Sequence, residues 1–388
     1  MPTVRFVSDQ FDTNTLTSRF TRSGQVRWAA FSFVALLLTG CGSDYPLGEE
    51  QRSAAEQNTS TLEGSTTGGG STAQNSAMTA WRAGFSSLHP KVQVQYASVG
   101  SGAGRAGLIE GATQFAGSDA YLQDEEIADA QQTCGADGAI NIPAYISPIS
   151  IAFNLPGIDD LNFDAETIGK IFRSEITQWN EPDLAALNPD VDLPDRRMTV
   201  VSRSDDSGTT ENFTEYLHEA APDVWTDDPD GTWPGSLRNE NAQGNTGVVS
   251  TVVRTEGAIT YADDSLVDDT LGKGTLKVGE DFVPVSAEAA AAAVAVSSRV
   301  EGRGEHDIAL ELDRTTTAPG AYPLVLVSYL IYCSEYIDPA AVELVKTFGL
   351  YVVSPEGQQL ASDSAKSAPM PEALAAEAKA AVESIAVR

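Results

Sequence analysis

The chain has 388 residues and a formal net charge of −31 at pH 7. Such an acidic chain is a poor partner for nucleic acid, whose phosphate backbone is held by basic patches, so any anion must be bound by local donors. The length exceeds what one hydrophobic core usually serves, so we expect two lobes. The three histidines, His89, His218 and His306, are scattered without zinc-ligand spacing. We therefore expect no metal site and no cofactor.

Residues 1–40 have the features of an export signal. Basic residues precede an apolar run, Trp28–Leu38, that is too short to span a membrane as a permanent helix. The run ends in LTGC, which resembles the lipobox of bacterial lipoproteins, in which the signal is cut before the cysteine and the sulfur is acylated. We expect Cys41 to carry lipid, such as palmitate, and to anchor the protein to the cell membrane outside the cytoplasm. Residues 41–61 are polar without an apolar period, which predicts a disordered tether.

The two remaining cysteines, Cys134 and Cys333, would share an oxidising compartment if Cys41 is lipidated. A disulfide between them is the expected arrangement there. Two buried free thiols are the alternative, since geometry is not visible in a sequence.

Globular sequence begins near Leu62 and alternates between helix and strand patterns. The glycine-rich GGGST is a predicted turn, NSAMTAWRAGFSSL has a helical period, and VQVQYASV alternates as a strand. GSGAGRAGLIEGA then predicts a turn opening a short helix, and QFAGSDAYL a strand that ends in polar residues. This order predicts an α/β fold, in which ligands collect at the carboxyl ends of strands.

Two long apolar segments, residues 140–157 and residues 322–333, enclose a second α/β section. They predict two crossing strands that link two lobes, with the chain leaving the first lobe and later returning to it. Two central strands of one sheet are the alternative. The chain ends in an alanine-rich amphipathic pattern that predicts a helix beginning at Pro371.

Three predicted helix starts combine hydroxyl groups with unpaired backbone N–H groups. They are Ser71-Thr72, Ser101 and Ser207-Gly208-Thr209. Each by itself is an ordinary helix cap. Together, and beside Arg203 and Asp119, they predict a cradle for one tetrahedral anion, with the N–H groups at residues 207–209 available as donors.

Two other functions fit parts of the same sequence. Residues 102–107 match G-x-G-x-x-G after a strand, as in dinucleotide-binding folds, but Asp119 is the only nearby candidate for the acidic partner and does not close a plain apolar strand. A phosphoryl-transfer or hydrolytic enzyme with Ser207 as nucleophile is also conceivable. It lacks the G-x-S-x-G elbow, and nothing marks His218 or His306 as its base.

The ordered motifs over nearly the whole globular chain resemble one family. These motifs are GGGSTAQ, VGSGAG, FAGSDAYL, INIPAYISPISIAFNLPG, IGKIFRSEITQWNEPDLAALNP, RSDDSGTTENFTEYL, GNTGVVSTVVRTEGAITYAD, YPLVLVSYLIYC and PEGQQLASDSAKSAPMPEAL. The family is that of the extracytoplasmic phosphate-binding proteins of ABC transporters, the PstS proteins. The resemblance implies a solute-binding protein and not an enzyme, with inorganic phosphate (HPO4 or H2PO4) as ligand and ABC transporter permease subunits as partners.

The resemblance also implies a two-lobe α/β fold of the periplasmic-binding-protein type, with the ligand cleft between the lobes and two crossing hinge strands. Its implied boundaries are residues 62–147 for the first part of lobe I, 148–317 for lobe II, and 318–388 for the second part of lobe I.

The resemblance implies a set of phosphate contacts: Thr72, Ala73, Ser101, Asp119, Arg203, Ser207, Gly208 and Thr209. Asp205 matches the residue that braces the arginine. Asp119 can only accept a hydrogen bond, so it would select a ligand that carries a proton and reject sulfate. The chain departs from the family at Ala73-Gln74, where many members have Phe-Pro, and at Asp206, where many have Gly and where we expect the side chain to point to solvent.

Overall fold

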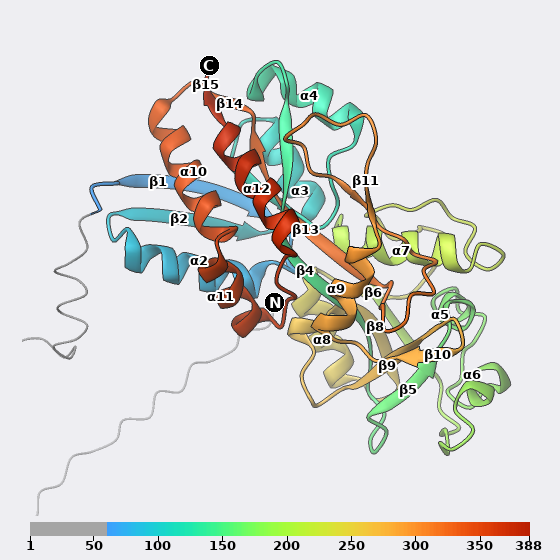
Figure 1. Cartoon of the computed structure of the whole chain (residues 1–388). Coiled ribbons are helices and arrows are strands. Elements are labelled where there is room, and N and C mark those ends of the chain that lie inside the picture. The colour runs from blue at the N-terminus through green and yellow to red at the C-terminus, as the bar shows by residue number, and fades with distance from the viewer. Residues whose placement is uncertain (1–59) are drawn as a thin grey trace, which may run out of the picture. The chain divides into compact units, whose positions relative to one another are not determined.

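The computed structural model describes residues 60–388 (Figure 1). The predicted signal, the predicted lipidation site Cys41 and nearly all of the predicted tether lie outside this range. The strands are β1 (Gly64–Gly70), β2 (Val92–Ser98), β3 (Phe115–Ser118), β4 (Ala139–Phe153), β5 (Asp160–Phe163), β6 (Thr199–Arg203), β7 (Glu240–Ala242), β8 (Ala258–Asp263), β9 (Gly272–Val278), β10 (Asp281–Val283), β11 (Ser298–Arg299), β12 (Leu310–Glu311), β13 (Val325–Cys333), β14 (Glu335–Tyr336) and β15 (Ala386–Val387).

The helices are α2 (Asn75–Leu88), α3 (Ser101–Ile109), α4 (Asp124–Cys134), α5 (Ala165–Phe172), α6 (Pro182–Leu187), α7 (Gly208–Ala220), α8 (Gly244–Arg254), the 3-10 turn η1 (Asp264–Leu266), α9 (Ala287–Ala295), α10 (Pro339–Val352), α11 (Pro355–Ala365) and α12 (Glu372–Ser384). The helical and strand patterns predicted for residues 75–99 are confirmed by α2 and β2. The predicted C-terminal helix is confirmed by α12, for which Pro371 is the N-cap.

One continuous sheet of eleven strands organises the described chain. Its main path runs β2-β1-β3-β13-β4-β8-β6-β7, and β9 carries β5 and β10 beside the end of β4. The strands β1, β2 and β3 are parallel to one another, as are β6, β7 and β8. Each parallel group makes one half of the sheet, with antiparallel β13 and β4 between them (Figure 1).

The two predicted long strands form as β4 and β13, and both are buried along their whole length. They pair with each other from Ala139↔Cys333 to Pro148↔Val325, so they are neighbours in one sheet. From Ile149 onward β4 pairs instead with β8 of the second half. The strand β4 therefore links the two halves. The segment that leads back from the second section into β13 lies beside β4, where the Ile149 N–H donates to the Leu324 carbonyl.

The glycine-rich stretch before the first helix was wrongly predicted as a turn, because Gly64–Gly70 forms the strand β1 between β2 and β3. Its glycines are required by close packing. A Cβ on Gly68 would lie 2.3 Å from the Phe115 ring, and one on Gly70, at φ +141°, would lie 1.9 Å from the Gly117 carbonyl oxygen. A run of glycines has no side-chain alternation, so the strand was invisible to pattern analysis.

Packing around the first half joins segments from both ends of the chain. The C-terminal helix α11 packs against α2, and α12 packs against β4 (Figure 1). Trp81 of α2 is fully buried and donates its indole N–H to the Gly357 carbonyl. The predicted disulfide is present between Cys134, at the end of α4, and Cys333, at the end of β13. The C-terminal helices α10 and α11 thus pack with the first half, against β1 and α2.

Candidate functional site

The predicted anion-binding residues lie where strands of both halves end. Thr72 follows β1, Asp119 follows β3, and Arg203 is the last residue of β6. Parallel pairing of β1 with β3, with Gly70 opposite Gly117, brings the first two to the same edge of the sheet. Since carboxyl ends of parallel strands share an edge, this topology collects polar side chains from distant parts of the sequence.

Asp119 is the centre of the site and is buried. Its Oδ1 accepts hydrogen bonds from the hydroxyl groups of Ser71, at 2.6 Å, and Ser328. Its Oδ2 accepts a longer one, at 3.3 Å, from Thr209 on α7. The carboxylate is therefore held by both halves of the sheet, and Oδ2 retains acceptor capacity.

Asn245, at the start of α8, joins the two sets of hydroxyl groups. Its backbone N–H and its Nδ2 donate to Thr72 Oγ1 at 3.2 and 3.0 Å, and Nδ2 also lies 3.2 Å from Thr209 Oγ1. Because Thr72 Oγ1 accepts twice, its own proton remains free to donate. The contact places the turn after β1 directly against the second half of the sheet.

Arg203 supplies a buried positive charge. Its Nε and Nη2 donate to the two carboxylate oxygens of Asp205, at 2.9 and 2.5 Å, and Asp205 also accepts the Gly244 N–H. Its backbone N–H donates to the Tyr261 hydroxyl. The remaining Nη1 is buried without a hydrogen-bond partner among the described residues. A guanidinium group that a carboxylate holds on one side, and that has an unused charged donor on the other, is suited to bind an anion.

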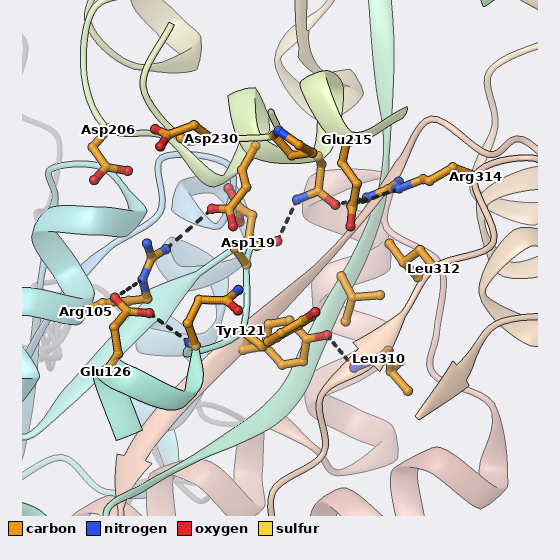
Figure 2. A pocket seen from close by; sticks show the side chains of 18 residues that line it. Arg105, Asp119, Tyr121, Glu126, Asp206, Glu215, Asp230, Leu310, Leu312 and Arg314 are labelled. Atoms are coloured by element: carbon orange, nitrogen blue, oxygen red, sulfur yellow. Dashed lines mark hydrogen bonds and ion pairs between the residues drawn. The ribbon is translucent and has the colours of Figure 1, made fainter. Parts of the chain in front are cut away.

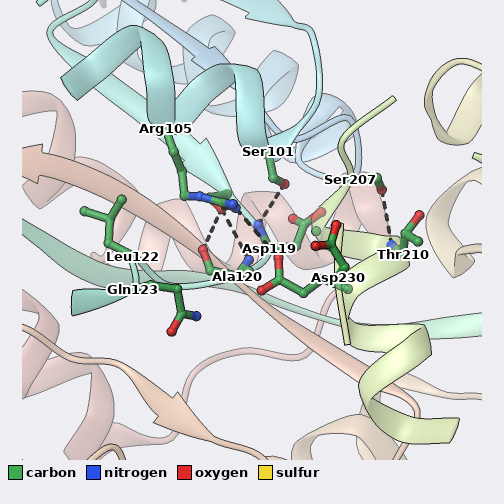
Figure 3. A network of polar contacts seen from close by, with 12 residues as sticks. Ser101, Arg105, Asp119, Ala120, Leu122, Gln123, Ser207, Thr210 and Asp230 are labelled. Carbon is green, nitrogen blue, oxygen red and sulfur yellow. Dashed lines mark hydrogen bonds and ion pairs between the residues drawn. The ribbon is translucent and has the colours of Figure 1, made fainter. Parts of the chain in front are cut away.

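The helix starts at Ser101 and Ser207 both approach Asp119 (Figure 3). Ser101 Oγ accepts the backbone N–H of Asp119 at 3.1 Å, so its proton is free to donate. Ser207 is the N-cap of α7, and its Oγ accepts the Thr210 N–H. A Cβ on Gly208 would lie 2.7 Å from the Asp119 Cβ, so only glycine permits this approach of α7.

One expectation about backbone donors needs correction, and a second predicted donor already has a partner in this structure. The Ser207 N–H donates to the Gly231 carbonyl at 2.9 Å, so it is not available as predicted, and Ser207 offers only its hydroxyl group. The Ala73 N–H donates to Ser71 Oγ at 3.0 Å. Its contact with a ligand stays a prediction. Asp206 is exposed, as expected.

Burial and hydrogen bonding oppose each other at the two carboxylates. Burial raises the pKa of Asp119 above its ordinary value, although the hydroxyl groups of Ser328 and Ser71 and the charge of Arg203 act to lower it. At Asp205 burial also acts to raise the pKa, but the hydrogen bonds and charge of Arg203 outweigh it and the pKa is lowered. Asp205 is thus the ionised partner of Arg203.

A cavity of about 420 Å³ opens beside Asp119 (Figure 2). Charged side chains from both halves line it, including Arg105, Glu126, Glu211 and Arg314. Of the predicted phosphate contacts, only Asp119 lines this cavity. Asp119 is therefore the residue that the predicted cradle and this cavity share.

Sequence reasoning did not select three of the residues that complete the site. Ser71 was noted at a helix start but not as a partner of Asp119, and Ser328 and Asn245 were not noted. The signal for Ser328 is a single serine among the aliphatic and aromatic residues of the buried strand β13. The sequence feature that could have identified Asn245 is a polar residue directly after a glycine at a helix start. Ser101, which follows Gly100, has the same feature.

Comparison with known proteins assigns the family. The family model for the PBP superfamily domain matches residues 54–356. The chain is 36% identical over 326 residues to the phosphate-binding protein PstS 3 of Mycobacterium tuberculosis, covering 81% of this chain and 86% of the relative. It is 34% identical over 385 residues to PstS 2 of the same species, covering 95% of this chain and 100% of the relative. The chain belongs to the PstS family.

Solved structures of phosphate-binding proteins share the fold. A high affinity periplasmic phosphate-binding protein bound with phosphate has a TM-score of 0.65 at 21% identity, covering 82% of this chain and 93% of that one. The phosphate-binding protein of Stenotrophomonas maltophilia has a TM-score of 0.62 at 21% identity, with the same coverage. The two-lobe periplasmic-binding-protein architecture is thereby confirmed.

Membership in the PstS family places the chain among solute-binding transport proteins and not among enzymes. In the site, the Ser207 hydroxyl group caps α7 by accepting the Thr210 N–H. Within residues 60–388 no cluster of His, Cys, Asp and Glu is suited to hold a metal ion. The described part of the chain also contains no helix long and apolar enough to cross a membrane.

Proposed function

We propose that this protein captures inorganic phosphate outside the cytoplasm and delivers it to the permease of an ABC transporter. The observation that carries the proposal is Arg203, whose Nη1 is buried and unpartnered beside the buried Asp119. A cation and a carboxylate at one site fit a protonated phosphate, which needs donors for its oxygens and an acceptor for its hydrogen. The names of the relatives, which are phosphate-binding proteins, support this ligand.

The hydroxyl groups around these two residues supply further donors. Thr72, Ser101 and Ser207 each have an oxygen that already accepts a hydrogen bond, so each can turn its proton toward a ligand. Gly208 and Thr209 begin α7, where the first backbone N–H groups lack intrahelical partners and the helix dipole favours an anion. Neutral donors of this kind hold an anion in a chain whose overall charge repels it.

The two halves act as lobes in this proposal. Residues 62–147 and 318–388 form lobe I, residues 148–317 form lobe II, and the crossing segments at Pro148 and Val325 form the hinge. The lobes close on phosphate because the donors come from both sides. A lipid on Cys41 and the polar residues that follow it hold the protein at the cell membrane near its permease.

Titration of the purified protein with phosphate by isothermal titration calorimetry tests this function. We expect saturable binding of one phosphate per chain, and no turnover of a phosphate ester measured in parallel. Absence of phosphate binding would refute the proposal. Ester turnover that is lost on Ser207→Ala would instead establish the enzymatic alternative.

The lipid anchor has its own test. In cells, we expect the wild-type protein in the membrane fraction and the Cys41→Ala variant outside that fraction. Equal distribution of the two would remove Cys41 as the anchor without affecting the phosphate assignment.

A further inference from the structure

Gln74 is a fully buried amide that reaches Asp119 through one intermediary. Its Nε2 donates to Ser328 Oγ and to the Tyr329 carbonyl oxygen, both at 2.8 Å. Since a carbonyl oxygen only accepts, the amide nitrogen and not the amide oxygen must face β13. The Oε1 atom is buried without a hydrogen-bond partner among the described residues. The two hydrogen bonds of Nε2 are therefore the contacts that set the orientation of this amide.

The hydrogen bond from Gln74 fixes the direction of the Ser328 hydroxyl group. With one lone pair of Oγ occupied by the amide, the hydroxyl proton must point to a different acceptor. The acceptors within reach are the close Oδ1 of Asp119 and the Ser118 carbonyl oxygen at 3.4 Å. The shorter contact, to a carboxylate, is the stronger one, so Ser328 donates to Asp119.

Ser71 donates to the same oxygen of Asp119 at 2.6 Å. Two hydroxyl donors therefore occupy Oδ1 and leave Oδ2 to face the ligand site, where Thr209 makes only a 3.3 Å contact. Hydrogen bonds donated to a carboxylate favour its ionised form. A proton placed on Asp119 could lie only on Oδ2, where it would make the residue a donor toward the ligand.

We propose that Gln74 and Ser328 are positioning residues that keep Asp119 ionised and acceptor-only toward the ligand, and thereby extend the rejection of sulfate to lower pH. The inference rests on the proposed phosphate-binding function and deepens it. Ionised Asp119 accepts the hydrogen of phosphate and repels sulfate. Protonated Asp119 donates to an oxygen of sulfate and admits it.

Other charged groups also face Asp119 and must be separated from this effect. Arg203 approaches from β6 and favours the ionised form, Asp263 approaches from β8, and Tyr96 approaches from β2. Across the cavity, Glu211 lies 3.9 Å from Arg105, whose guanidinium also donates to Ser118 beside Asp119. Asp263 and Glu211 both have a pKa of about 7, raised by burial.

The test measures sulfate affinity by calorimetry from about pH 4, near the ordinary pKa of an aspartate, to about pH 8. Sulfate carries no proton over this range, so changes in its affinity report on the protein. For wild type we expect sulfate binding to strengthen as the pH falls through the Asp119 titration. Ser328→Ala removes one charge-assisted donor to Asp119. The pH at which sulfate binding begins to strengthen therefore rises by about one unit, and between the two onset values the variant binds sulfate about tenfold more tightly than wild type.

Gln74→Met conserves volume and removes the amide donor, so Ser328 Oγ can then accept a hydrogen bond from a protonated Asp119. In Gln74→Met we expect the pH at which sulfate binding begins to strengthen to rise as well, but by less than in Ser328→Ala. Ser328→Thr restores the hydroxyl group and the wild-type profile. Ser150→Ala is the matched control, because it removes a buried hydroxyl that donates to a different carboxylate, Asp264. The same comparison of sulfate profiles is repeated in proteins that carry Asp263→Asn or Glu211→Gln. These changes remove the other titrating groups as the cause of a shift.

The outcomes separate this inference from the proposed function. Loss of phosphate binding in wild type refutes the function itself. Retained phosphate binding with the same sulfate profile in Ser328→Ala and wild type overturns the inference, as does a Ser328→Thr profile that matches Ser328→Ala. A shift that disappears in the Asp263→Asn background assigns the effect to Asp263 and also overturns it. If Ser328→Ala does not fold, Gln74→Met carries the test.

Discussion

Arg203 shows how one side chain is divided between structure and ligand. Asp205 takes two of its donor nitrogens in a paired contact, and this fixes the plane of the guanidinium group while Nη1 stays unused. The pair is almost fully buried, with Arg203 1% and Asp205 9% exposed at the side chain. A ligand meets a charge that is already oriented and desolvated, which lowers the cost of binding.

Arg203→Ala is expected to weaken phosphate binding strongly. The change removes the charged donor and leaves Asp205 partly buried without its partner, and such truncations cost about 2–5 kcal/mol. This corresponds to a rise in Kd of roughly 30-fold to several thousandfold. Calorimetric titration measures it, with Arg196→Ala as the control, because Arg196 forms a half-exposed ion pair with Glu256. An unchanged Kd in Arg203→Ala would remove this residue from the site.

Asp119→Asn is expected to narrow the gap between phosphate and sulfate affinity. The hydroxyl groups of Ser71 and Ser328 donate to Oδ1, so the amide oxygen of the new side chain takes that position and its NH2 group faces the ligand. Sulfate then gains a donor where it met a buried charge, which favours it by about 1–3 kcal/mol. Competition titrations give the affinity ratio. A ratio equal to that of wild type would show that Asp119 does not enforce selection.

At the scale of elements, glycines decide how closely α3 approaches the sheet. A Cβ on Gly104 would lie 2.5 Å from the Gly70 Cα and 2.6 Å from the Gly69 carbonyl oxygen, both in the backbone of β1. The middle glycine of the G-x-G-x-x-G match at residues 102–107 therefore has a packing cause in this fold. It brings the start of α3, with Ser101, next to the end of β3, with Asp119.

Gly104→Ala and Gly107→Ala form a matched pair on the same helix. At Gly104 the new methyl group meets backbone that cannot move aside, so we expect a loss of about 1–3 kcal/mol in the free energy of unfolding. At Gly107 the nearest atom lies 3.7 Å away, an ordinary contact, so alanine should stabilise the helix by about 0.5–1 kcal/mol. Urea unfolding compares them. Equal effects at the two positions would contradict the packing argument.

The same elements show what sequence analysis can and cannot supply. Helix and strand periods located α2, β2 and α12, because their apolar residues repeat on one face. The strand β1 was missed because its glycines have no such pattern. Family motifs selected Asp119 and Arg203, but the hydroxyl of Ser328 comes from a strand more than two hundred residues away from Asp119 in the sequence. Its role depends on sheet register, which the sequence does not reveal.

At the scale of the whole molecule, the acidic residues divide into two groups. Most carboxylates of residues 60–388 are at least partly exposed. The net charge of −31 keeps the chain solvated. A few are buried where the two halves meet. Among these is Asp263, fully buried opposite Ile149 at the point where β4 passes from one half of the sheet to the other. The free energy of folding thus depends on whether the buried carboxyl group of Asp263 at this junction is protonated or ionised.

Asp263 makes the stability of the fold dependent on pH. Burial raises its pKa to about 7, although Ser265 and Ser147 act to lower it. In the unfolded chain the pKa is about 3.9, so between these values the folded state binds more protons than the unfolded state. The stabilising contribution is therefore complete below about pH 4 and is lost as the pH rises through about 7.

Asp263→Asn is expected to remove this dependence, because the amide cannot ionise and keeps the shape that accepts the hydrogen bond from Tyr145. The free energy of unfolding of wild type should fall relative to the variant by about 1.4 kcal/mol per pH unit at the steepest point, and by a few kcal/mol in total, between roughly pH 4 and pH 7. Urea unfolding of both proteins, without phosphate, at both ends of this range measures the difference. Glu211 is common to both proteins, so its own raised pKa cancels. A difference between the two proteins that stays constant with pH would show that Asp263 does not titrate at this junction.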